Sequence, residues 1–229
     1  MKNNIKKMWM WIAILALVHT GCYYQKKHVP EEKAVIPKVK KMVVFGFRPV
    51  MSKGEDPDVI RGSLSGSVFM AGPVPKNVVD KMTSNLFNKL LEDQSHDLIS
   101  PAQANGVFSS LVSSDLTLRD IEIYQKIGKI FDADAVLTGY IYRWKEREGT
   151  DFAVNRPASV AFDLYLIRPR NGAILWKGRF DKTQRSLSEN LFDMNTFIKG
   201  GGKWMTAEKL AELGLENLLG RFLEREGGQ

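Results

Sequence analysis

The stretch ASVAFDLYLIRPRNGAILWKGRFD, residues 158–181, decides the fold of this chain. Apolar side chains alternate in both halves, which is the period of a strand with one buried face. They are Val160, Phe162, Leu164, Leu166, Ile174, Trp176 and Phe180. Asn171-Gly172 separates the halves and predicts a type I′ hairpin turn, which needs positive φ at both central residues. The stretch therefore predicts an antiparallel hairpin with Phe162 and Trp176 on its inner face.

Three further strands are predicted outside this hairpin. DAVLTGYIYRWK (134–145) alternates and would place five side chains on one face, namely Val136, Thr138, Tyr140, Tyr142 and Trp144. KMVVFGFRPV (41–50) is a compact apolar run that ends at Pro49, and HDLISP (96–101) is a short strand that stops at Pro101. With the hairpin, these segments supply a five-stranded core.

Three helices are predicted from apolar residues at spacings of three and four. They cover residues 75–93, 116–133 and 206–224, with Thr117 and Thr206 as the N-caps of the second and third. The element order β-α-β-α-β-β-β-α indicates an α/β (α+β) fold, in which helices pack on a mixed, mostly antiparallel sheet. We expect a single domain over residues 41–229.

The N-terminal stretch KKMWMWIAILALVHTGCYYQKK (6–27) contains the only cysteine, Cys22. Lysines precede an apolar run at residues 8–18, which is too short to span a bilayer and is typical of a signal peptide. The end of this segment resembles the lipobox of bacterial lipoproteins, although His19 occupies a position usually held by leucine. The resemblance implies removal of residues 1–21, acylation of Cys22 by fatty acids such as palmitate, and a lipidated tether over residues 22–40. The alternative is an ordinary secretory signal that is cleaved after Gly21.

Charge and residue chemistry narrow the class of function. The formal charge is +7, and it falls to +4 without residues 1–21, which is a mild excess that gives no support for nucleic-acid binding. No catalytic constellation, metal-ligand set or cofactor motif emerges from the sequence, which has three histidines. We interpret His96 as structural, and Asp132 and Asp134 as capping or turn residues.

Two stretches carry a family resemblance. They are IEIYQKIGKIFDADAVLTGYIYRWKER (121–147) and VAFDLYLIRPRNGAILWKGRFDKTQRSLSENLF (160–192). Together they resemble periplasmic lipoprotein domains of the curli-secretion (CsgG-like) and penicillin-binding-protein-activator (LpoB-like) group, whose fold is similar to the N-terminal domain of TolB. The resemblance implies a non-enzymatic assembly or regulatory role. The long paired segments that the curli channel uses for its barrel are not seen in the sequence, which counts against a pore.

The first functional hypothesis is a periplasm-facing lipoprotein of the outer membrane that binds another envelope protein. Tyr23 after the cysteine favours the outer membrane in enteric-type sorting. A self-associating subunit of an envelope secretion complex is the alternative. A cell-wall hydrolase is disfavoured, because the sequence offers no set of acid, base and metal ligands.

Partner-binding residues are expected in two loop regions, residues 49–75 and 183–204, which hold apolar side chains among polar and glycine residues. The candidates are Leu64, Phe69, Met70, Leu191 and Phe192. The alternative is that these side chains fold back on the core.

Overall fold

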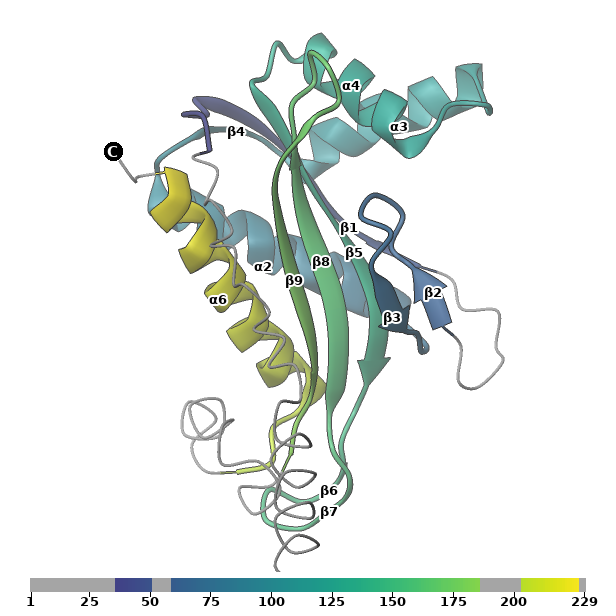
Figure 1. Cartoon of the computed structure of the whole chain (residues 1–229), viewed down its shortest axis with the longest axis vertical. Helices are drawn as coiled ribbons and strands as arrows, with labels where there is room; N and C mark the ends of the chain where they lie inside the picture. The colour runs from purple at the N-terminus through teal and green to yellow at the C-terminus, as the bar shows by residue number, and fades with distance from the viewer. Residues whose placement is uncertain (1–35, 51–58, 186–202, 227–229) are drawn as a thin grey trace, which may run out of the picture. The chain divides into compact units, whose positions relative to one another are not determined.

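A five-stranded mixed sheet in the order β4-β1-β5-β8-β9 forms the centre of the structure (Figure 1). The structure is a computed structural model that describes residues 36–50, 59–185 and 203–226. β1 pairs in parallel with β4 and β5, while β5-β8-β9 is antiparallel. The elements are β1 (Lys41–Pro49), β2 (Val59–Arg61), β3 (Val68–Met70), α2 (Lys76–Asp93), β4 (Asp97–Ile99), α3 (Pro101–Ser114), α4 (Asp120–Ile130), β5 (Ala135–Lys145), β6 (Glu148–Gly149), β7 (Val154–Arg156), β8 (Ser159–Ile167), β9 (Ile174–Thr183) and α6 (Ala207–Glu226). The predicted α+β class is confirmed.

The predicted hairpin is β8-β9. Phe162 lies opposite Phe180 and Leu166 opposite Trp176, so the expected apolar face is confirmed for these residues. Ile174 was wrongly placed on that face, because the register shifts beyond Leu166, and Ile174 pairs with Ile167 and is 39% exposed. The turn differs from the prediction. Only Gly172 has positive φ, at 71°, and its N–H donates to the carbonyl of Arg168 over 2.8 Å. The connection is therefore longer than a two-residue type I′ turn, because the sheet pairing ends at Ile167 and Ile174.

β5 carries a bulge that changes one predicted face. Its register with β8 shifts between Ile141 and Arg143, so Tyr142 is the additional residue. Beyond the bulge the alternation is reversed, and Trp144 packs against the opposite core from Tyr142. The prediction that both side chains share a face was wrong, because a strict two-residue period does not survive an inserted residue.

Helices cover both faces of the sheet. α2 and α6 bury their apolar stripes on one face, α2 against β1 and α6 against the inner side of the hairpin. α3 and α4 cover part of the other face together with Phe69 of the small β2-β3 hairpin, and we call this the α3/α4 face. No helix in the described part of the chain is long and apolar enough to cross a membrane.

The helices differ from the prediction in two main respects. α3 was not predicted, and Ser100 caps it through the backbone N–H of Gln103, with Pro101 as its first residue. α4 begins at Asp120, after the N-cap Arg119, whose N–H donates to the Glu122 carboxylate over 2.9 Å. Thr117 instead donates to Asp115. The cap predicted at Thr206 is confirmed by the bond from the Lys209 N–H.

The chain enters the sheet at the end where α6 finishes. The N–H of Val39 donates to Glu226 over 2.8 Å, and the second carboxylate oxygen of Glu226 lies 2.9 Å from His96 Nε2. Residues 36–40 were expected to be part of the tether. Ile36 and Val39 are buried, so this segment packs on the domain. The Asp134 carboxylate accepts the N–H groups of residues 40 and 41, and these bonds lower its pKa.

Candidate functional site

The α3/α4 face of the sheet changes from apolar to polar along its length. Its side chains on β8 run from Ile167 through Tyr165, Asp163 and Ala161 to Ser159. At the polar end, Ser159 lies between Lys145 of β5 and Thr183 of β9. The next row toward the middle of the sheet contains Arg143, Ala161 and Asp181. Strand register thus gathers charged and hydroxyl side chains at one end of the sheet.

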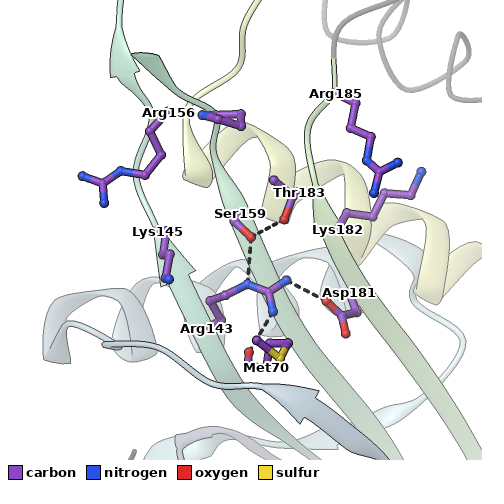
Figure 2. Close-up of a pocket in the computed structure, with 10 residues that line it drawn as sticks. Met70, Arg143, Lys145, Arg156, Ser159, Asp181, Lys182, Thr183 and Arg185 are labelled. Carbon is purple, nitrogen blue, oxygen red and sulfur yellow. Dashed lines mark hydrogen bonds and ion pairs between the residues drawn. The ribbon is translucent and has the colours of Figure 1, made fainter. Parts of the chain in front are cut away.

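Arg143 is the centre of a hydrogen-bond network at this end (Figure 2). Its Nε donates to Ser159 Oγ over 2.7 Å, Nη1 to the Met70 carbonyl over 2.7 Å, and Nη2 to Asp181 Oδ1 over 2.6 Å. Ser159 Oγ is also 2.6 Å from Thr183 Oγ1. Arg143 is only 6% exposed. A buried guanidinium with three separate acceptors is held in one position, because each bond fixes a different edge of the planar group.

Asp181 connects this network to the β2-β3 hairpin. Its Oδ2 accepts from Arg179 Nη2 over 2.9 Å, and the same nitrogen donates to the Val68 carbonyl over 2.7 Å. Arg143 and Arg179 therefore hold the backbone of β3 at residues 68 and 70, while one carboxylate bridges the two arginines. This arrangement fixes the hairpin against the open end of the sheet.

A cleft of about 780 Å³ opens over Arg143. Figure 2 shows Lys145 and Arg156 on one side of Arg143, and Lys182 and Arg185 on the other. Five basic side chains and one acid, Asp181, are among the residues that line the cleft, together with Met70 and Pro157. Arg156 also forms an ion pair with Glu148 at the exposed rim. The lining gives the cleft an excess of positive charge and an apolar portion.

A second polar group is buried beside the cleft, under the β2-β3 hairpin. Asp163 is 2% exposed, and its Oδ2 accepts from Tyr142 over 2.9 Å and from Tyr165 over 2.5 Å. Oδ1 has no protein partner among the described residues. Burial raises the pKa of the Asp163 carboxyl to about 6, against the opposing effect of the tyrosine hydroxyls. The same burial raises the pKa of Tyr142.

The chemistry of the cleft is suited to binding. The hydroxyl of Ser159 is bonded to Arg143 and Thr183, neither of which is a base that could activate a nucleophile. Within residues 36–50, 59–185 and 203–226, no three His, Cys, Asp or Glu side chains are placed to hold a metal ion. Fixed and rim cations around an open cavity instead provide donors for oxyanions.

The structure separates the predicted partner-binding residues. Phe69 is 1% exposed and stacks on Tyr142, so it is a core residue and not a surface residue as expected. Side chains alternate between the two faces of β3, so Phe69 points into the core while its neighbour Met70 is 48% exposed and lines the cleft. Leu64 is half-buried and packs on the core of the α3/α4 face. Leu191, Phe192 and Cys22 lie outside the described residues.

Sequence reasoning did not identify the basic residues of the cleft. Arg143, Lys145, Arg156 and Arg185 come from β5, β7 and the segment after β9, and they are separated by up to about forty positions. The available signal was the shift from apolar to charged residues at the end of β5, in YRWKERE (142–148). Strand pairing is needed to bring that end next to the charged end of β9.

Comparisons with known proteins concern the fold. No family model and no curated protein matches the sequence. Among solved structures, the LpoB C-terminal domain from Escherichia coli is 17% identical with a TM-score of 0.39, and the match covers 64% of this chain and 85% of that chain. Lipoprotein GNA1162 from Neisseria meningitidis is 16% identical with a TM-score of 0.42, covering 70% of this chain and 94% of that chain.

The hypothetical protein CT253 from Chlamydia trachomatis is also similar, at 12% identity and a TM-score of 0.47, and the match covers 83% of this chain and 99% of that chain. The LpoB-like group that the sequence resembles is thus among the similar structures.

Proposed function

We propose that the protein is a lipid-anchored, periplasm-facing lipoprotein of the outer membrane that acts as a non-enzymatic binding factor for another envelope protein. The anchor rests on the sequence around Cys22, which combines a basic start, a short apolar run and the Thr-Gly-Cys ending. Stable membrane attachment of this kind needs at least two acyl chains, which a mature lipoprotein carries.

One observation supports the binding role most directly. Met70 and Val68 are exposed on β3, and Met70 lines the cationic cleft. Apolar side chains beside arginines are a common composition of protein interfaces, in which Met and Arg are enriched relative to other surfaces. The surface formed by Val68, Met70 and the cleft is therefore where we place the partner.

The test is photo-crosslinking in cells that make the full chain. A photoreactive residue is placed at Met70, and the matched control is placed at Leu116, which is 86% exposed between α3 and α4. We expect a defined adduct with one envelope protein from position 70 and not from position 116. An adduct with a second copy of this chain would instead support the self-associating alternative. Identical adduct patterns from both positions would contradict the proposed surface.

A further inference from the structure

The floor of the cleft is a fixed cation. Arg143 has bonds in three directions, to Ser159, Met70 and Asp181, and it is almost fully buried. A guanidinium has five N–H donors, so these three bonds leave donor capacity for a further acceptor. The position of this charge is set before any ligand arrives, which reduces the entropic cost of ordering the side chain on binding.

The acid that lines the cleft is already engaged. Asp181 uses Oδ1 for Arg143 and Oδ2 for Arg179, so both of its oxygens are bonded within the framework. At the rim, Arg156 contacts Glu148, but both side chains are more than half exposed, and such pairs contribute little and exchange readily. Among the described residues that line the cleft, the basic side chains therefore outnumber the acidic ones.

The shape of the cleft distinguishes among anionic ligands. Its volume of about 780 Å³ is in the range of sites for molecules much larger than a single phosphate. Met70 and Pro157 add apolar surface to the lining. The floor guanidinium is recessed, whereas Lys145 and Arg185 stand on opposite sides of it (Figure 2). A flat bilayer surface contacts rim charges, while a projecting side chain is needed to reach a recessed one.

We propose that the cleft binds an acidic peptide segment of the protein partner, with one carboxylate directed to Arg143 and others held by Lys145 and Arg185. Carboxylates match the planar donor pattern of arginine, and the apolar part of the segment would contact Met70. This inference rests on the proposed function, because it specifies the chemistry of the partner at the surface named there.

The experiment uses the full chain in mild detergent and a labelled hexaglutamate peptide, with binding followed by fluorescence anisotropy. The variant Lys145→Glu/Arg185→Glu reverses two rim charges and leaves Arg143 intact. Its control, Lys126→Glu/Lys129→Glu, makes the same charge change on exposed residues of α4. We expect the cleft variant to weaken binding by about ten-fold or more and the control by much less, because close charge pairs contribute strongly to affinity.

Three outcomes would overturn the inference. The first is equal loss of hexaglutamate binding in the cleft variant and the control, which would show a net-charge effect. The second is no binding of hexaglutamate to the wild-type chain. The third is cleft-dependent binding of vesicles that contain phosphatidylglycerol, or of inorganic phosphate, in the absence of peptide binding, which would identify a different ligand.

The proposed function can fail separately. If position 70 gives no protein adduct in cells, the proposed function is contradicted. The peptide titration needs no protein partner, so it still tests the acidic-segment inference by itself. If position 70 captures a protein equally well in the wild type and in the cleft variant, the acidic-segment inference is overturned and the binding role stands.

Discussion

The guanidinium of Arg179 lies 4.1 Å from the centroid of the Phe69 ring. The same ring stacks on Tyr142 with a centroid distance of 3.8 Å. Phe69 is therefore covered on both faces, by a cation from β9 and an aromatic ring from β5. Through this residue the small β2-β3 hairpin becomes part of the core, although it lies within a segment that the sequence presents as a long loop.

We predict that Phe69→Ala strongly destabilises the domain, by about 3–5 kcal/mol, because the change leaves a cavity between two packed groups. Met70→Ala is the matched control on the same strand, and its side chain is half exposed, so we expect a loss within about 0.5 kcal/mol. The free energy of unfolding in urea measures both. Equal losses in the two variants would contradict the placement of the β3 faces.

We predict a similar loss for Trp176→Ala, about 3–5 kcal/mol, because its ring packs on Phe222 of α6 in the core of the hairpin's inner face. Lys177→Ala, one residue further along β9, is exposed and serves as the control. Chemical denaturation of the two variants should give well-separated midpoints. A loss below about 1 kcal/mol for Trp176→Ala would show that this side chain is not packed as described.

Asp163 should make stability depend on pH. Its pKa is about 6 in the folded state and 3.8 as the reference for the unfolded chain. A raised carboxyl pKa favours the protonated folded form, so its contribution is complete below about pH 4 and is lost as pH rises to about 6. The difference corresponds to at most about 3 kcal/mol.

Asp163→Asn removes this titration and isolates it from other carboxyl groups. We expect the free energy of unfolding of the wild type to fall relative to that of the variant as the pH rises from 4 to 6.5. Urea denaturation of both proteins at each pH measures this difference. Asp80→Asn provides a comparison, since Asp80 is exposed to solvent on α2. A difference between wild type and Asp163→Asn that is the same at pH 4 and pH 6.5 would contradict the assignment.

Cys22→Ser tests the proposed anchor. Without the thiol there is no site for acylation, so the chain should be found in the soluble periplasmic fraction or remain as an unprocessed precursor. Fractionation and the mass of the mature chain report the two results. Normal maturation together with unchanged membrane retention would refute the lipoprotein assignment, and an ordinary signal cleaved after Gly21 would instead give a shortened, unmodified chain.

Periodicity predicted the large elements because their faces are set by burial. Val160 and Leu164 on β8, like Met82 and Leu86 on α2, sit at spacings that their cores require. α3 was not predicted although Ala104, Phe108 and Leu111 lie at helical spacing, because the segment also contains Gly106 and several serines, and only Ala104 of this stripe is fully buried. Its capping signals, Ser100 and Pro101, were available in the sequence but also fit a strand that ends at a proline.

The cleft was not predictable by the same reasoning. Its position depends on the bulge at Tyr142, which turns Arg143 onto the α3/α4 face, and a bulge leaves no regular period in sequence. Its charges also come from separate strands whose register must be known before they can be grouped. Met70 was expected at an exposed surface because it is a large apolar residue near glycine and serine residues, and the same reasoning failed for its neighbour Phe69, which is buried.

Val39, near the start of the described domain, lies close to the end of the sheet at which β5 begins, whereas the cleft opens at the end of the sheet at which β5 finishes. The eleven residues of β5 separate these points by roughly 35 Å. Tension between an anchored N-terminus and a partner in the cleft would pull β1 and β5 lengthwise in opposite directions. Their parallel hydrogen bonds would then bear the load in shear and fail together rather than unzip one after another, so this strand pair would resist such tension more strongly than a pair pulled apart from one end.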